Sequence, residues 1–177
     1  MKTAFIIFSL VIVCSILLLF IVGIFSKSGK ASGLVEGSLS KCPDTPNCVC
    51  SEQENDAKHA IAPIPLPQEI TFDPLPIFKD VVREMGGTVQ AESNNYLAAI
   101  FSSAIFGFVD DLEVRIDSAQ QVVHIRSASR IGYGDLDVNR KRVELLKNLY
   151  SQKASEANQS RKTTQGNGGM SFDVISK

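Results

Sequence analysis

The sequence has little of what a nucleic-acid-binding domain requires. It contains no long basic run and no series of aromatic residues placed to stack on bases. All but one of the 18 Lys and Arg residues, and all 19 Asp and Glu residues, lie beyond residue 25, which gives that part a net charge of −2. Domains that bind nucleic acids are usually clearly basic. We therefore expect no nucleic acid among the partners.

Two motifs of catalytic and metal sites are also missing. There is no G-x-S-x-G turn to present a nucleophilic serine, and in an extended strand Ser127 and Ser129 would point away from His124. The cysteines follow C-x5-C-x-C rather than the C-x2-4-C spacing of a zinc knuckle, although His59 is near. We predict no catalytic residue, no metal and no cofactor.

The same cysteines favour a disulfide. A bond between Cys42 and Cys48 would close a short Pro-rich loop, and it is expected if the domain lies outside the cytoplasm. Cys50 is then left over. It is either a partly buried free thiol or a partner for disulfide exchange.

Charge is absent from a long apolar run near the start. Ala4 to Phe25 are 22 uncharged residues, enough for a helix of about 33 Å, close to the roughly 30 Å bilayer core. A cleaved signal peptide usually has a shorter apolar region that ends at a small-residue site, and the nearest such site, Gly29–Ala31, lies well past the run. We predict a single-pass transmembrane anchor over residues 1–25. Lys residues flank both ends and give no clear orientation.

The distribution of polar and apolar residues divides the rest of the chain into three parts. Residues 26–40 are predicted to be a flexible linker, 41–150 a globular domain with a Cys/Pro-rich start, and 151–177 a disordered polar tail. The fold class is α+β, with a four-stranded antiparallel sheet and two helices covering one face. One helix should begin after Asp73 and end at Gly86; the other should run from about Asp137 to Tyr150, with Leu145 and Leu146 in its apolar stripe. The predicted strands are Thr88–Glu92, Tyr96–Ser102, Phe108–Asp117 and Val122–Arg130.

A four-residue turn at Ser118–Gln121 sets a register between the last two strands. It places Val114 opposite Ile125 on a dry face, and Glu113 opposite Arg126 on the other face. The segment Arg126–Arg142, RSASRIGYGDLDVNRKR, is rich in Arg and Asp. It either holds the fold together through ion pairs or forms a groove for an anionic ligand. The candidate ligand-binding residues are Asp110, Asp111, Glu113, His124, Arg126, Ser127, Arg130, Tyr133, Asp135, Asn139, Arg140 and Arg142.

Three stretches carry a resemblance to a known family. CPDTPNCV (Cys42–Val49), FGFVDDLEV (Phe106–Val114) and RSASRIGYGDLDVNRKRVE (Arg126–Glu144) are similar to the bacterial and plastid family catalogued as domain of unknown function family 1499. Two positions depart from it, because such proteins usually have Ser in place of Cys50 and Gly in place of Asp137. The resemblance supports the domain boundaries and implies no activity.

These observations favour a membrane protein of the cell envelope whose domain lies outside the cytoplasm. Its expected function is a non-enzymatic binding or scaffolding module, with an anionic ligand or another envelope protein as partner. The alternative is an enzyme with an Arg/Asp/His centre acting on an anionic substrate. A deep pocket in which Arg126, Asp111 and His124 converge would favour the enzyme.

Overall fold

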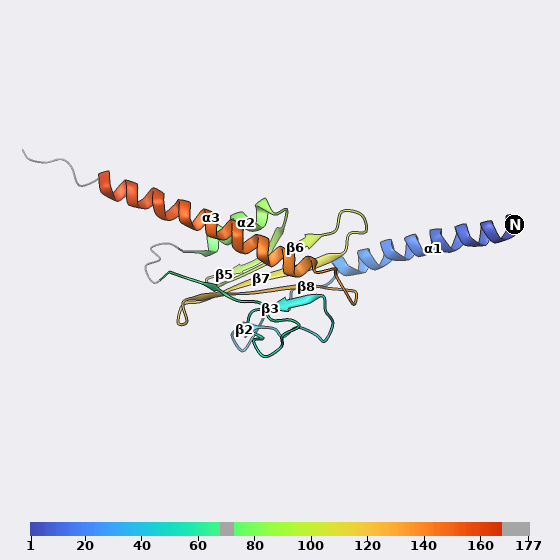
Figure 1. Ribbon diagram of the computed structural model, residues 1–177, viewed down its shortest axis with the longest axis horizontal. Coiled ribbons are helices and arrows are strands. Elements are labelled where there is room, and N and C mark those ends of the chain that lie inside the picture. Colours follow the sequence, from blue (N-terminus) through green and yellow to red (C-terminus); the bar gives the residue numbers. More distant parts are fainter. Residues whose placement is uncertain (68–72, 168–177) are drawn as a thin grey trace, which may run out of the picture.

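The computed structural model describes residues 1–67 and 73–167. Its first element is α1 (Lys2–Lys27), a helix that points away from the rest of the protein over most of its length (Figure 1). The run is helical because it contains no proline and only one glycine, Gly23. Its side chains are exposed except near the end, where Gly23 and Ser26 are buried. In length and apolar composition α1 is sufficient to cross a membrane.

The domain is α+β, as predicted, but its sheet has six antiparallel strands instead of four. The four predicted strands are present, with ends within one residue of those expected. The sheet order is β3–β8–β7–β6–β5, and β4 pairs with the same edge of β8 as β3. The strands are β3 (Cys48–Cys50), β4 (Ile64–Pro65), β5 (Thr88–Ser93), β6 (Tyr96–Ser102), β7 (Val109–Asp117) and β8 (Val122–Ser129).

The two additional strands come from the Cys/Pro-rich segment. They are two and three residues long, too short to show the alternation by which a strand is recognised in a sequence. They form because β8 would otherwise leave an open edge, whose backbone N–H and C=O groups need partners.

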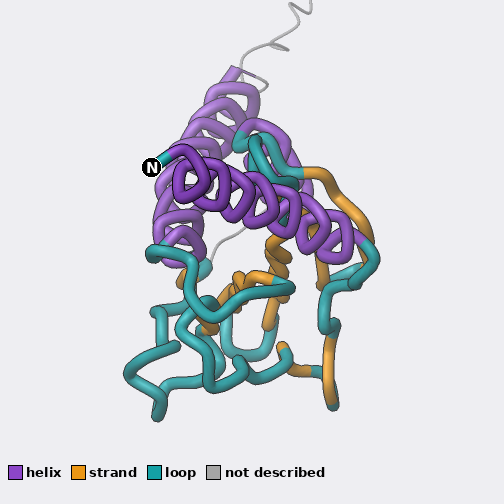
Figure 2. The backbone as a smooth tube through the Cα atoms, turned by 90° about the vertical axis from the view of Figure 1, so that its right-hand side faces the viewer, coloured by secondary structure: helices purple, strands orange, loops and turns teal. Residues whose placement is uncertain are grey.

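Two helices cover one face of the sheet, α2 (Leu75–Glu84) and α3 (Val138–Asn167). In Figure 2 the strands lie between these helices and a layer of loops. The ring of Phe78 in α2 stacks on that of Tyr150 in α3, with 4.0 Å between centroids. The core between helices and sheet includes Val81, Val82, Leu97, Leu112, Val114, Ile125, Val143 and Leu146.

The helix α3 is longer than predicted. It was expected to end near Tyr150, followed by a disordered tail from Ser151, yet it continues to Asn167. The segment is rich in good helix formers and has no glycine or proline before Gly166. Ala154 packs against the core and Lys153 pairs with Glu84 at 2.8 Å. Helical structure therefore extends into the segment for which the polar composition predicts a disordered tail; residues 168–177 lie outside the described part of the chain.

The sequence predicts a flexible linker at residues 26–40. In the structure these residues lie against the sheet face that the helices leave open, and include a hairpin of β1 (Leu34–Val35) and β2 (Ser38–Leu39). The Ser26 hydroxyl accepts a hydrogen bond from the backbone of Val109 at 2.8 Å, and the Gly33 N–H donates to Glu113 at 2.8 Å. Contacts with distant residues thus hold a segment whose composition alone suggested a tether.

Candidate functional site

A row of charged side chains lies on the sheet face away from the helices. The predicted register is confirmed, since Glu113 lies opposite Arg126 and Val114 lies opposite Ile125. Because side chains alternate between faces along a strand, the apolar pair enters the core and the charged pair lies on the other side. Residues 29–43, which include the β1–β2 hairpin, cover this face, and the Glu113 side chain is fully buried.

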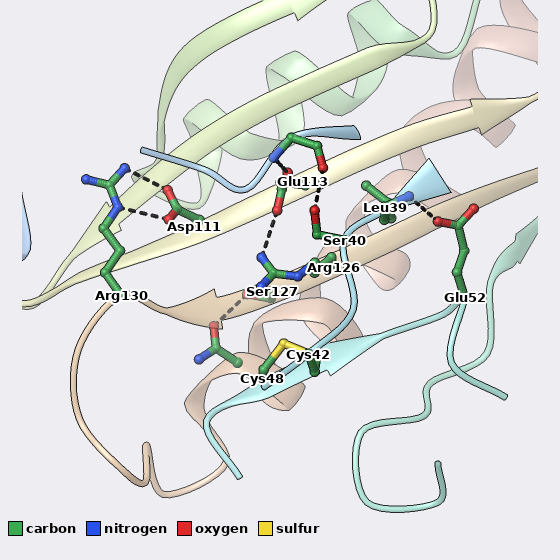
Figure 3. Close-up of polar contacts among 12 residues, drawn as sticks. Leu39, Ser40, Cys42, Cys48, Glu52, Asp111, Glu113, Arg126, Ser127 and Arg130 are labelled. Carbon is green, nitrogen blue, oxygen red and sulfur yellow. Dashed lines mark hydrogen bonds and ion pairs between the residues drawn. A yellow bond between two sulfur atoms is a disulfide. The ribbon is translucent and has the colours of Figure 1, made fainter. Parts of the chain in front are cut away.

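Glu113 has a complete set of partners. Its carboxylate accepts hydrogen bonds from Arg126 Nη1 at 2.8 Å (Figure 3), from the Tyr96 hydroxyl at 2.7 Å and from the Gly33 N–H at 2.8 Å. Burial, together with the hydrogen bond to Glu113, raises the pKa of Tyr96, so the phenol keeps the proton that it donates. Glu113 therefore joins β6, β8 and the chain that follows α1.

Arg126, in contrast, is only partly satisfied. Its side chain is 5% exposed, and one nitrogen binds Glu113. Its Nε is buried and has no hydrogen-bond partner among residues 1–67 and 73–167. A buried donor left unpaired costs about 1–3 kcal/mol. The Arg126 guanidinium therefore retains a donor that no described residue satisfies.

Arg126 lies at a groove between the end of β8 and the chain that follows α1. The volume of the groove is about 470 Å³. Lys30 and Lys41 lie at its exposed rim. Four of the lining side chains are cationic and one is a carboxylate, so the groove favours an anion. It is lined by Gly29, Lys30, Ser32, Lys41, Cys42, Pro43, Asp111, Arg126, Ala128, Ser129 and Arg130.

Arg130 connects this groove to α1. Its Nε and Nη2 donate to the two carboxylate oxygens of Asp111, at 2.9 and 2.7 Å. The same bonds raise the pKa of Arg130, which stays charged. Its Nη1 also lies 3.3 Å from the carbonyl oxygens of Ser26 and Lys27. A cation there stabilises the carbonyls at the end of a helix, so Arg130 fixes the end of α1 beside the groove.

His124 belongs to a different cluster. It is buried, not solvated as a lone strand histidine would be, and its Nδ1 lies 3.1 Å from the Ser51 hydroxyl. Its Nε2 lies 3.8 Å from Glu52, which also binds Arg115. Burial lowers the pKa of His124, which favours the neutral ring. His124 does not line the groove, so the predicted Arg126, Asp111 and His124 do not converge.

Five other predicted residues form a network on the helix side of the sheet. Ser127 donates to Asn139 at 2.6 Å, and Arg142 pairs with Asp110 at 2.6 Å. Asp135 accepts a hydrogen bond from the Asn139 N–H at 2.8 Å and so caps the start of α3. The network attaches the first turn of α3 to β7 and β8. Because this network and His124 lie on opposite faces of the sheet, Ser127 and His124 cannot belong to one catalytic triad.

The remaining predicted residues contribute to neither cluster. Arg140 forms no ion pair with any described residue but donates to the backbone carbonyls of Lys58 and Ala60, each at 3.0 Å. Tyr133 is 74% exposed. Asp137 has a φ of 61°, the left-handed region that glycine adopts without strain. That conformation suits the glycine that the family resemblance implies at this position.

The cysteines have the states that the sequence favoured. Cys42 and Cys48 form a disulfide, so they are not available together as metal ligands. Cys50 is a buried free thiol, and burial raises its pKa, which disfavours the reactive thiolate. Its burial makes it a structural residue rather than an exchange partner.

Several residues of the groove were not predicted. Lys30 and Lys41 fall in segments that composition assigned to a linker and to the start of the domain. No motif or spacing in the sequence indicated the hydrogen bonds that Gly33 and Tyr96 donate to Glu113. Only the pairing of the N-terminal segment with the sheet brings them together, and nothing in the sequence indicates that pairing.

Comparison with known proteins identifies the family. A search of the curated proteins and a search of the solved structures found no significant match. The family model for the protein of unknown function DUF1499 matches residues 38–149. The matched part contains all six strands of the sheet, both halves of the Glu113–Arg126 pair and the disulfide. The chain therefore belongs to the DUF1499 family, as the three sequence motifs indicated.

Proposed function

We propose that this protein is a membrane-anchored, non-enzymatic binding module that holds an anionic group in the groove beside Arg126. The observation that carries the proposal is the buried Nε of Arg126, which has no partner in the described part of the chain, beside a groove with two lysines on its rim. A phosphate or carboxylate can accept hydrogen bonds from the planar guanidinium. The positive charges of Lys30 and Lys41 would attract the same anion.

The membrane placement rests on α1 and on the disulfide. α1 has the length and composition of a transmembrane segment. Its last turns are built into the domain through Gly23 and Ser26, which supports an anchor that is retained over a signal sequence that is removed. The Cys42–Cys48 bond supports a location outside the cytoplasm. The ligand then meets the groove directly at the end of the anchor.

An enzyme is less well supported. The separation of His124 from Arg126 and Asp111 leaves the groove without a histidine as general base. The carboxylate at the groove, Asp111, is held by two hydrogen bonds from Arg130. Holding an anion needs only the cations that are present.

The test uses the full chain in nanodiscs of a neutral phospholipid. Inorganic phosphate should raise the melting temperature, because a ligand that binds only the folded state stabilises it. The double variant Lys30→Gln and Lys41→Gln should lose most of this shift. The double variant Lys141→Gln and Lys153→Gln, an equal change of charge on α3 and away from the groove, should keep it.

A second arm separates the possible sources of the anion. Nanodiscs that contain phosphatidylglycerol, without added phosphate, should raise the melting temperature if a lipid headgroup fills the groove. A shift with phosphate alone would assign a soluble anion instead. If neither condition distinguishes the parent from the Lys30/Lys41 variant, the proposed function is wrong.

A further inference from the structure

The loop between β6 and β7 has an unusual composition for an exposed turn. Residues 103–108, SAIFGF, contain no charged side chain and three large apolar ones. Ile105 is 72% exposed, and Phe106 and Phe108 are partly exposed. The only polar side chain, that of Ser103, accepts a hydrogen bond from the Phe108 N–H at 3.0 Å. The tip of the loop therefore presents an almost entirely apolar surface.

This loop packs against α1. The rings of Phe106 and Phe20 meet edge to face, with 5.3 Å between centroids. Gly23 permits the approach, because a Cβ at that position would lie 1.8 Å from the carbonyl oxygen of Phe106. In Figure 1 the loop lies beside the end of α1 from which the domain begins. The exposed surface of the loop is thus continuous with the exposed apolar surface of the helix.

The position of Phe20 sets the depth of this contact. The apolar run of α1 ends at Phe25, five residues later. At about 1.5 Å per residue, Phe20 lies about 7.5 Å inside the apolar run. Apolar segments that bind at a membrane interface reach about 5–10 Å into the headgroup and acyl boundary. Phe106, beside Phe20, falls in that range.

The backbone of the loop also suits an apolar environment. The Ser103 N–H donates to the Phe108 carbonyl at 2.8 Å, and the Gly107 N–H donates to the Ser103 carbonyl at 3.1 Å. These bonds satisfy groups that are costly to leave unpaired where water is scarce. The Lys27 side chain approaches Gly107 and can extend its amine toward headgroups.

We infer that residues 103–108 form a second membrane contact, a wedge that enters the bilayer interface beside α1. The inference rests on the anchoring role proposed for α1 but not on the ligand of the groove. The partner is the boundary between lipid headgroups and acyl chains. The wedge would hold the sheet at a fixed angle to the bilayer, with its opposite hairpin at Ser118–Gln121 away from it.

The chain contains no tryptophan, so single substitutions give clean fluorescent reporters. The full chain is reconstituted in liposomes as Ile105→Trp and, as a second probe of the same loop, Ala104→Trp. Leu17→Trp, exposed in the middle of α1, reports on the anchor. Ala119→Trp, exposed in the hairpin at the other end of β7, is the control that should stay in water. Melting curves establish that each variant is folded.

The expected result is a blue-shifted emission from the Ile105→Trp variant, quenched by lipids brominated near the headgroup and protected from iodide. Ala119→Trp should show the opposite behaviour. If Leu17→Trp is quenched by bromines at the bilayer centre but both loop probes are as open to iodide as Ala119→Trp, the wedge is refuted and the anchor stands. If Leu17→Trp is not quenched by lipid, the proposed anchor fails and the wedge with it.

Discussion

Glu113 and Arg126 face each other across β7 and β8, with 2.8 Å between the guanidinium and the carboxylate and less than a tenth of either side chain exposed. Replacing one member leaves the other charged and buried. We therefore expect Glu113→Gln to lower the free energy of unfolding by about 3–5 kcal/mol. Chemical denaturation of the full chain in detergent micelles, followed by circular dichroism, measures this loss.

The pair also predicts strong coupling. In a double-mutant cycle with Arg126→Gln, the second substitution should cost much less once the first is present. The exposed pair Lys79–Glu92 is the matched control, and its cycle should give at most about 1 kcal/mol. Two single variants of unchanged stability that no longer bind phosphate would contradict the structural role and leave only a role in recognition.

The close approach of Gly23 to Phe106 gives a second prediction. Gly23→Ala places a methyl group where the Phe106 carbonyl lies, so the loop must move and stability should fall by about 1–3 kcal/mol. Hydrogen exchange of the Gly107 amide, which is bonded to Ser103, should become faster. Gly134→Ala, whose new methyl group would meet open space, should change neither quantity. Unaltered exchange in Gly23→Ala would mean that α1 does not pack against the loop.

The cysteines predict a definite alkylation pattern. In denaturant without reductant, Cys14 and Cys50 should be alkylated; after reduction, all four cysteines should be. In the native protein Cys50 should stay protected, because it is fully buried. Opening the short Cys42–Cys48 loop should cost about 2–3 kcal/mol. Intact-mass analysis decides the pattern, and four alkylated cysteines without reductant would reject the bond.

His124 predicts a dependence of stability on pH. Burial holds its pKa below the ordinary value of 6.5, so the unfolded chain binds this proton more readily. The free energy of unfolding should be fully retained above about 6.5, fall as the pH drops below it, and level off below the folded pKa. The groups that face the ring are Ser51, Glu52 and Arg115.

The matched variant for this titration is His124→Gln. Its stability should change less than that of the parent between about pH 7 and 5, the range in which histidine titrates. His59, the other histidine, is present in both proteins, so the difference between their curves isolates His124. Asp117 affects stability in a different pH range. Hydrogen bonds from the backbone hold its pKa below 3.8, so its contribution to the free energy of unfolding is lost only in stronger acid. Equal slopes in parent and variant over the histidine window would show that His124 is not the group responsible.

The sheet and its register were predictable because alternation is a local signal. Any register that places Val114 opposite Ile125 also places Glu113 opposite Arg126. One choice of turn therefore paired the apolar residues on one face and the charged residues on the other. The helix α3 was less predictable. Leu145 fits a helical stripe by spacing, yet it is 48% exposed, while Val143 and Leu146 are buried. Leu145 and Leu146 belong to two apolar stripes that lie one residue apart on the helix. Only the position of the sheet determines which stripe is buried.

The groove was predicted in part, through Asp111, Arg126 and Arg130 on and beside the strands. Its other wall is formed by residues 29–43, where small and polar side chains gave no periodicity to interpret. What orders that wall is a long-range contact, the Gly33 N–H on Glu113, and contacts of this kind leave no local pattern. The division of the charged residues between the two faces followed from alternation, but the covering layer did not.

The attachment of α1 to Arg130 limits where the domain can go. A domain on a free tether samples a hemisphere of positions and can capture a ligand at some distance from its base. Here the carbonyls of Ser26 and Lys27 are bound to the same arginine that lines the groove, which leaves no swivel between helix and sheet. For a helix that spans a bilayer, the groove then stays at one height and in one orientation. For a ligand carried by the same bilayer, each encounter is then a search in two dimensions, along the plane in which the protein itself diffuses.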